Sequence, residues 1–332
     1  MTSLFRLFLG SFFCIFLATV AVAAEAPGFK YENQVYAGET LPPSLKQKLF
    51  ELEVELNRQR RQAIDAHVID RYVAERATRE NRTVEQIQNE LFRVQDPDEA
   101  EVKGFYDANR SRIRGSFEQV RGQIAEYLRN QRRQQRVAAV LETIRKEKGY
   151  EVYLAEPEAP LMKVATEGYP FKGSPDAKVT IVEFADYQCP HCKDAMPVMK
   201  RLLERYGDKV RVVFRNFPIN RSGISRQVAV GAVCAGEQGR FWEYHDLAFE
   251  RQNYLMAITP KDLADELGLD IAKFEACFKG DAAAAKVARS LDEGRRLGIS
   301  GTPTFYVNGR QLHVHGDLES SLSAVIDREL AR

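Results

Sequence analysis

The chain has 332 residues, and its 48 basic and 47 acidic side chains leave a formal charge of +1. The length suggests two folded units or one large one, and 44% hydrophobic residues are ample for a buried core. These figures exclude a disordered chain and a disulfide-dense mini-protein, and they give no overall electrostatic reason to bind nucleic acid or an anionic membrane. The five cysteines are an odd number, which in an oxidising compartment leaves one thiol without a partner.

Residues 1–24 have the pattern of a secretory signal peptide. Arg6 precedes an apolar run over residues 7–22, and Ala21 and Ala23 form an Ala-x-Ala cleavage site. An uncleaved membrane anchor is the alternative, because the run approaches the length of a spanning helix. Cleavage would remove Cys14 and leave four cysteines in the exported chain.

Residues 25–155 contain no cysteine and show helical periodicity, so we expect a helical N-terminal domain there. A long amphipathic helix is predicted to begin near Pro43. Its apolar positions, which recur at helical spacing, are Leu45, Leu49, Leu52, Leu56, Ile64, Val68 and Tyr72. The simplest interpretation of the periodicity is a small helical domain or a dimerisation arm.

Three further helix starts are predicted in the same segment. Thr83 begins a capping box that opens a short helix. Asp96 is predicted to be the next N-cap, with Pro97 at the first helical position. A second long helix is predicted to start at Ser116 and to end near Gly149.

A Phe-Tyr-Asp-Ala-Asn turn at residues 105–109 and a Phe-Glu-Gln-Val helix start at residues 117–120 accompany the first long helix. With them, the stretch from about Leu56 to Pro157 resembles the N-terminal helical segment of SurA-type periplasmic chaperones. The resemblance implies dimerisation or client binding for residues 25–155, and it carries no catalytic motif.

Residues 156–172 are predicted to be a linker, because they open with the Glu-Pro-Glu-Ala-Pro sequence of residues 156–160. After the linker the periodicity changes to that of a mixed α/β domain over residues 173–332. The expected strands cover 179–184, 210–214, 304–307 and 310–314, the last two joined at Asn308-Gly309, and the expected helices cover 197–206, 225–297 and 318–332. This order is that of a thioredoxin fold with a helical insertion, so the predicted fold class is α/β, preceded by an all-α N-terminal domain.

The motif Cys189-Pro190-His191-Cys192 lies between the first expected strand and the first expected helix. A cysteine at a helix N-terminus faces unpaired backbone N–H groups and the positive end of the helix dipole, which favours thiolate over thiol. His191 is expected to donate a hydrogen bond to the Cys189 thiolate, or to place positive charge near it. We therefore expect Cys189 to be the nucleophile and Cys192 the buried resolving thiol.

Half a zinc site and a static disulfide are the alternatives for this motif. A zinc site needs two more ligands at suitable spacing, and Cys234 and Cys277 form no second Cys-x-x-Cys pair. A structural bridge would have no need of a strand-to-helix turn. Redox chemistry is therefore the preferred interpretation, and it requires neither a metal nor an organic cofactor.

Two other features agree with redox chemistry. Glu183 interrupts an apolar strand, where an acid is costly unless it is paired or used, so we expect a proton acceptor for Cys192. The alternative for Glu183 is an edge or salt-bridged position. Pro303 opens a strand after Thr302, where a cis peptide bond would leave the backbone free to pair with an extended substrate. An ordinary trans proline is the alternative there.

The segment from about Gly173 to Ala331 resembles the DsbA-like branch of the thioredoxin superfamily. The resemblance rests on residues 184–193 (Phe-Ala-Asp-Tyr-Gln-Cys-Pro-His-Cys-Lys), 214–218 (Phe-Arg-Asn-Phe-Pro), 234–245 (Cys-Ala-Gly-Glu-Gln-Gly-Arg-Phe-Trp-Glu-Tyr-His) and 301–305 (Gly-Thr-Pro-Thr-Phe). It implies periplasmic thiol–disulfide exchange, a cis Pro303 and a buried acid at Glu183. Arg221 and Ser222 replace a histidine that is common in that branch, which leaves open which partner recharges this domain.

Cys234 and Cys277 both fall in the expected helical insertion, 43 positions apart. In an oxidising compartment we expect a structural disulfide between them, worth roughly 4 kcal/mol by chain entropy. Two separate buried thiols are the alternative.

The sequence thus predicts a periplasmic thiol–disulfide oxidoreductase that forms or rearranges disulfides in exported proteins. Its expected partners are client proteins with thiols or disulfides and an unidentified membrane redox partner, with no nucleic acid. The N-terminal helices could also supply a homo-oligomer, which would favour an isomerase. The alternative function is a chaperone, in which the helical domain binds clients and the redox domain is auxiliary.

Overall fold

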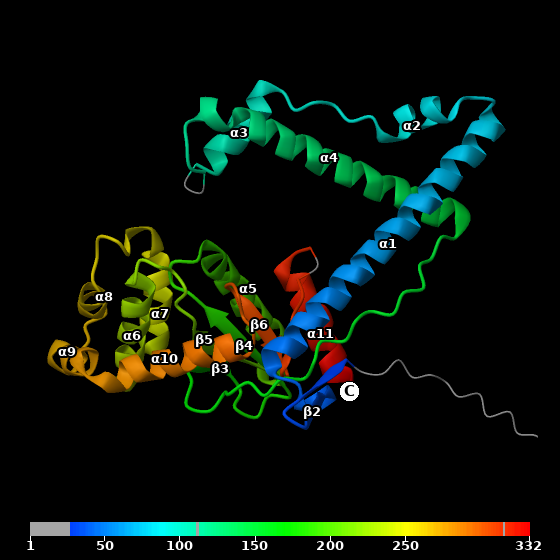
Figure 1. Cartoon of the computed structure of the whole chain (residues 1–332). Coiled ribbons are helices and arrows are strands. Elements are labelled where there is room, and N and C mark those ends of the chain that lie inside the picture. Colours follow the sequence, from blue (N-terminus) through cyan, green and yellow to red (C-terminus); the bar gives the residue numbers. More distant parts are fainter. Residues whose placement is uncertain (1–26, 111–112, 315) are drawn as a thin grey trace, which may run out of the picture.

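The computed structural model describes residues 27–110, 113–314 and 316–332. The predicted signal peptide and Cys14 lie outside these residues. Figure 1 shows two parts, a sheet flanked by helices and a helical arm that stands away from it. No helix within the described ranges combines the length and the apolar character needed to cross a membrane.

The sheet has five strands in the order β3-β5-β4-β6-β7. Their bounds are Phe171–Gly173 (β3), Val179–Ala185 (β4), Val210–Asn216 (β5), Thr304–Val307 (β6) and Arg310–Gln311 (β7). β4 and β5 are parallel, whereas β3 pairs antiparallel with β5, and β6 with β4. β4 and β5 are almost wholly buried, as their β-branched and apolar residues require.

Helices cover both faces of this sheet. The helices of this part are α5 (Pro190–Tyr206), α6 (Ile224–Glu237), α7 (Phe241–Glu250), α8 (Pro260–Glu266), α9 (Ile271–Lys279), α10 (Asp281–Arg296) and α11 (Leu318–Ala331). Leu202 of α5 and Leu322 of α11 pack against Ile181 on one face, while Leu291 of α10 packs against Phe184 on the other. The predicted thioredoxin fold with a helical insertion, α6 to α10, is therefore confirmed.

Two local predictions in this part need comment. The Asn308-Gly309 turn is confirmed, with φ of 47° and 82°, and it joins β6 to a strand of only two residues. The helix predicted to begin at Pro197 begins at Pro190, so Pro197 lies inside α5. The earlier start follows from Pro190, which suits the first helical position because its missing N–H has no partner there in any case.

The N-terminal helices are α1 (Pro43–Glu80), α2 (Val84–Phe92), α3 (Glu99–Ala108) and α4 (Phe117–Lys148). The predicted starts at Pro43, Thr83 and Ser116 are confirmed, and α4 ends at Lys148 with Gly149 as its C-cap, at φ of 65°. The N-cap predicted at Asp96 is wrong. Asp98 caps α3 instead, because its carboxylate accepts a hydrogen bond from the Glu101 N–H at 2.8 Å and Glu101 reciprocates.

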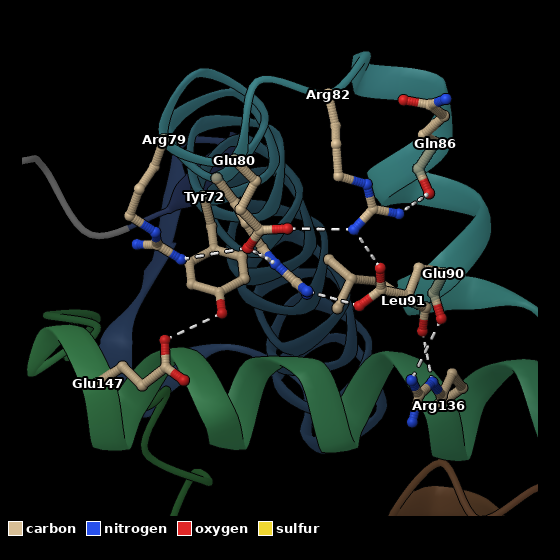
Figure 2. A network of polar contacts seen from close by, with 10 residues as sticks. Tyr72, Arg79, Glu80, Arg82, Gln86, Glu90, Leu91, Arg136 and Glu147 are labelled. Atoms are coloured by element: carbon tan, nitrogen blue, oxygen red, sulfur yellow. Dashed lines mark hydrogen bonds and ion pairs between the residues drawn. The ribbon is translucent and has the colours of Figure 1, made fainter.

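Figure 2 shows the polar network that joins α1, α2 and α4. Arg76 of α1 and Arg82 both contact the carboxylates of Glu80 and Glu90. The Tyr72 hydroxyl donates to Glu147 of α4 at 2.9 Å. Beneath these contacts lies an apolar cluster formed by Tyr72, Val73, Ala77, Ile87, Leu91, Val140 and Ile144. These contacts fix the C-terminal end of α1 to α2 and α4.

The apolar stripe predicted along α1 divides into two environments. Tyr72 is buried in the arm cluster, whereas Leu52 and Leu56 are 55% and 46% exposed. The N-terminal half of α1 contacts the sheet-containing part through other residues, among them Phe50, whose ring packs edge-on against His313. A short hairpin of β1 (Gly28–Tyr31) and β2 (Gln34–Ala37) precedes α1 and was not predicted.

Candidate active site

Cys189 is the N-cap residue of α5, with Pro190 at the first helical position. Its carbonyl oxygen accepts hydrogen bonds from the N–H groups of Cys192 at 3.1 Å and Lys193 at 3.3 Å, so the first turn is closed around it. The half-buried Cys189 sulfur therefore lies at the positive end of the α5 dipole.

The surroundings of Cys189 favour its thiolate form. Its pKa is lowered to about 6, first by the hydrogen bond from the Cys192 thiol and then, against the opposing effect of burial, by Thr302 and the backbone N–H groups of Cys192 and His191. A pKa of about 6 makes roughly 90% of the thiol anionic at pH 7, against about 1% for an ordinary cysteine of pKa 9. Cys189 is thus poised as nucleophile and as leaving group.

Cys192 has the opposite character. It is fully buried, and neither it nor Cys189 is in a disulfide in this structure. Burial raises the pKa of its thiol far above the ordinary value, and the hydrogen bond to Cys189 and the negative charge of Cys189 raise it further. Cys192 is therefore a protonated donor to the Cys189 thiolate.

His191 contributes differently from the sequence-based expectation. Its backbone N–H is among the groups that lower the Cys189 pKa. Its imidazole is 75% exposed and lies with Nδ1 3.8 Å from a carboxylate oxygen of Asp194, and it makes no hydrogen bond to either sulfur within the described residues. His191 therefore acts on Cys189 through its backbone N–H at the helix start and not through its imidazole ring.

Glu183 lies on β4, is 5% exposed and is close enough to both cysteines to affect their titration and be affected by it. β4 is flanked by β5 and β6, and the register places Glu183 beside Phe214 and Phe305, so it is not on an edge strand. Burial, and after it the charge of Cys189, raise the pKa of this carboxyl from 4.5 to about 8. Its charge in turn contributes to the raised pKa of Cys192. A carboxyl with this pKa can exchange a proton near neutral pH.

A groove of about 860 Å³ between α5 and α7 reaches Glu183. Met196 of α5 and Trp242 and Phe249 of α7 form part of its apolar wall, and Lys193 lies at its border. This groove gives the buried carboxyl a route to solvent.

The Thr302–Pro303 peptide bond is cis. Thr302 and Pro303 are half-buried and precede β6, and the Cys189 thiol donates to the Thr302 carbonyl oxygen at 3.1 Å. The structure therefore brings together Cys189, Cys192, Glu183, Thr302 and Pro303 from three separate segments of the chain.

Two buried or half-buried polar residues, Asp186 and Gln252, shape the loop before Cys189, and sequence reasoning gave neither a role. Asp186 accepts hydrogen bonds from the N–H groups of Gln188 at 2.7 Å and Ile219 at 2.9 Å. Gln252 donates from Nε2 to the carbonyl oxygens of Tyr187 and Cys189, both at 2.9 Å. Asp186 had a weak signal as an acid directly after a buried strand, whereas Gln252, 63 positions beyond Cys189, had none.

Cys234 and Cys277 are joined in a disulfide that links α6 to α9 within the insertion. The described chain therefore holds only two free thiols, both in the Cys189–Cys192 motif. This arrangement can exchange a disulfide with another dithiol, because it pairs a stabilised thiolate with a buried thiol and a proton-exchanging acid.

Comparison with known proteins places the similarity in the second half of the chain. Residues 165–328 match the thioredoxin family. The probable disulfide bond formation protein D of Bacillus anthracis is 32% identical over 174 residues, which cover 48% of this chain and 77% of that protein. The crystal structure of oxidised BdbD from Bacillus subtilis is 27% identical, with a TM-score of 0.47, and covers 53% of this chain and all of that one.

A further set of relatives consists of sodium/proton antiporters. The Na(+)/H(+) antiporter NhaA 3 of Salinispora tropica is 37% identical over 156 residues, which are 47% of this chain. This chain spans only 24% of that antiporter's length, so the similarity concerns one segment of the longer protein.

Proposed function

The chain belongs to the DsbA-like disulfide bond formation proteins of the thioredoxin family, and we propose that it exchanges disulfides with exported proteins in the periplasm through Cys189 and Cys192. The observation that carries this proposal is the contrast between the two thiols. The pKa of Cys189 is lowered to about 6 while that of the adjacent, buried Cys192 is raised. A redox pair needs one sulfur that is a good leaving group and a second sulfur that stays protonated until it attacks the mixed disulfide.

In the oxidising direction the protein begins with a Cys189–Cys192 disulfide. A client thiolate attacks the Cys189 sulfur, a client–Cys189 bond forms, and Cys192 leaves with the electron pair and takes up a proton. A second client thiolate then attacks the client sulfur of this mixed disulfide, and Cys189 leaves as its stabilised thiolate. The client has lost two electrons, and the protein has gained them as a dithiol.

Glu183 is proposed to handle the proton of Cys192. The acid is buried near both sulfurs, and its pKa of about 8 lets it hold or release a proton as Cys192 changes state. The groove between α5 and α7 supports exchange of this proton with water. Metal ions and organic cofactors have no step in this cycle, because the sulfur atoms carry the electrons.

Thr302 and Pro303 are proposed to hold the client backbone beside Cys189. Their cis bond and the contact of the Thr302 carbonyl with the Cys189 sulfur support this role. The Cys234–Cys277 disulfide supports an oxidising compartment, where such bonds persist. A disulfide-bearing membrane partner would reoxidise the dithiol between turnovers.

The test uses the oxidised protein and a reduced peptide that contains two cysteines. We expect the peptide to gain an intramolecular disulfide, and Cys189→Ser to slow this transfer at least 100-fold. In a separate incubation with the disulfide-bonded form of the same peptide, reduced Cys192→Ser should accumulate a mixed disulfide, because Cys189 attacks the peptide disulfide and no Cys192 thiol is present to resolve the product; mass spectrometry detects it. The double variant Cys234→Ser/Cys277→Ser is the matched control and should still transfer its disulfide at a temperature where it remains folded. Transfer at the wild-type rate by Cys189→Ser would refute the proposal.

The direction of the reaction is decided by a separate measurement. Equilibration of the Cys189–Cys192 pair with glutathione buffers gives its reduction potential. The thiolate stabilisation at Cys189 predicts an oxidising value, because a low pKa stabilises the reduced form relative to the disulfide. A potential as reducing as that of thioredoxin would indicate a reductase instead.

A further inference from the structure

The lower half of α1 carries a row of leucines that the described chain leaves partly or largely exposed. Leu45, Leu49, Leu52 and Leu56 recur at spacings of four, three and four, which places them on one stripe of the helix. Leu52 and Leu56 are 55% and 46% exposed. None of the four belongs to any of the hydrophobic clusters formed by the described residues. We call this stripe the leucine face.

The other side of the same half-helix is already occupied. Phe50 is buried against His313, the Asn57 side chain donates to the Ala155 carbonyl oxygen, and Arg61 pairs with Glu156 at 3.3 Å. At 3.6 residues per turn these contact residues lie roughly opposite the leucine face. Of the other helices of the arm, α2 and α4 lie against the C-terminal half of α1 (Figure 1). The contacts of this half-helix therefore lie away from Leu52 and Leu56, the most exposed part of the leucine face.

The spacing of the leucines is that of a coiled-coil seam. Steps of four, three and four follow the alternation of a and d positions, which in a longer coiled coil averages 3.5 residues and keeps those positions facing a partner helix. Leu45 and Leu52 then occupy d positions, and Leu49 and Leu56 occupy a positions. A helix that packs only against its own globular domain shows a wider apolar stripe and needs no such seam on its outer side.

The charges beside the seam select the partner and its orientation. In a parallel, in-register pair, each g residue faces the e residue five positions further along the second helix. Lys48 would face the second chain's Glu53, and Glu55 would face its Arg60. Glu53 and Arg60 form no ion pair within the described residues. Lys48 has an exposed i,i+3 partner, and Glu55 contacts the exposed Arg58 and Gln59 of its own helix.

An antiparallel pair would keep one complementary contact, between Lys48 and Glu55, but it suits the other two charges less well. It would place Glu53 opposite Lys46, which is 12% exposed and already bonded to Glu39 at 2.9 Å. It would place Arg60 beyond the first residue of the other α1, which begins at Pro43. We propose that the leucine face binds a second copy of this chain as a parallel, in-register coiled coil. In this dimer each redox domain would lie on the side of its own α1 that faces away from the second chain.

The first test is the mass of the full chain in solution by sedimentation. We expect two copies, and we expect Leu52→Glu/Leu56→Glu to raise the dissociation constant at least 100-fold. Leu161→Glu/Met256→Glu is the matched control, because it adds the same charges at apolar residues that are 56% and 80% exposed elsewhere. The control should remain dimeric. Circular dichroism should be unchanged in both variants, because all four side chains are exposed.

The second test concerns orientation. In the Cys189→Ser/Cys192→Ser background, Gln59→Cys occupies the next d position and should form an intermolecular disulfide, because residues 59 of a parallel pair face one another. Arg58→Cys, one position away from the seam, should not. Glu53→Lys should weaken the dimer, and Lys48→Glu added to it should restore binding.

Three outcomes would overturn the proposal. One is a wild-type chain that sediments as a single copy throughout the micromolar range. Another is a dimer that survives Leu52→Glu/Leu56→Glu. The third is a monomer whose leucine variant loses affinity for an unfolded, cysteine-free client, which would assign the leucine face to clients. None of these measurements depends on disulfide transfer, so their failure leaves the proposed redox function standing.

Discussion

The sulfur of Cys189 lies 3.1 Å from the carbonyl oxygen of Thr302, the residue whose bond to Pro303 is cis. A neutral thiol donates a hydrogen bond to this oxygen, but a thiolate has no proton to donate. Ionisation of Cys189 therefore removes this hydrogen bond, while the Thr302 side chain favours the thiolate, so Thr302 contacts both protonation states of Cys189.

Ionisation of Cys189 gives the first prediction. Its alkylation rate and its thiolate absorbance near 240 nm should rise with pH around a midpoint of about 6. Cys192→Ala should move the midpoint upward, because the hydrogen bond from the Cys192 thiol is the largest cause of the lowered pKa. Cys192 should remain unmodified at neutral pH in the wild type. A midpoint near 9 in the wild type would contradict this account.

The sequence was sufficient for the parts of the fold and site that depend on local pattern. The strand of residues 179–184 and the Asn308-Gly309 turn each have a signal within a few residues. The Cys-x-x-Cys motif indicated a helix N-terminus at Cys189, although the periodicity placed the helix start at Pro197. Glu183 was recognisable because a charge in a buried strand is costly.

Features that depend on distant contacts were missed. The carbonyl contacts of Gln252 exist only because α7 ends beside the Cys189 loop.

The choice of Asp98 over Asp96 as N-cap is decided by side-chain geometry within one turn, since both residues have the same preference. The division of the α1 stripe could not be foreseen, because periodicity does not say which neighbour each half meets.

The second prediction concerns Glu183→Gln. The folded-state pKa of Glu183 is about 8 and the ordinary value is 4.5, so between these values the folded chain holds a proton that the unfolded chain has released. Stability from this group is present below pH 4.5 and is lost as pH rises through 8. Glutamine resembles the protonated acid at every pH. We therefore expect equal stability of the two reduced proteins near pH 4.5, and a variant more stable by a few kcal/mol at pH 9.

Urea titrations at both pH values measure this difference. Deprotonation of Cys189 also changes stability over the same range, but it occurs in both proteins and largely cancels. The variant should nevertheless resolve the client–Cys189 mixed disulfide more slowly, because the Cys192 thiol that attacks it has lost its proton acceptor. A variant less stable than the wild type at pH 9 would show that Glu183 has a stabilising partner when ionised.

The third prediction concerns the loop before Cys189. Gln252→Ala removes two hydrogen bonds to the carbonyl oxygens of Tyr187 and Cys189, so it should cost about 1–3 kcal/mol in the free energy of unfolding. Asn253→Ala, an exposed neighbour, is the matched control and should change stability by less than about 0.5 kcal/mol. Because the loop positions the first turn of α5, Gln252→Ala should also shift the Cys189 titration midpoint upward. An unchanged midpoint would mean that Gln252 stabilises the loop without positioning the sulfur.

The last prediction concerns Arg215, which is wholly buried between β5 and α10. Its guanidinium pairs with Glu293 at 2.7 Å, donates to the Ala165 carbonyl oxygen at 2.6 Å and lies 3.7 Å from the centre of the Tyr169 ring. Arg215→Met leaves the partly buried Glu293 carboxylate with only the Ala165 N–H and the more distant Arg296, so we expect a loss toward the lower end of about 3–5 kcal/mol.

Adding Glu293→Leu to Arg215→Met removes the stranded carboxylate, and the double variant should lose less than the sum of the two single losses. The exposed Arg221→Met is the control for loss of an arginine and should be near neutral. Chemical denaturation of the oxidised proteins measures all four free energies. If the losses in the free energy of unfolding are additive, the ion pair contributes no coupling energy. Residues 165–169 would then be held to the sheet by the Ala165 hydrogen bond and the contact with the Tyr169 ring.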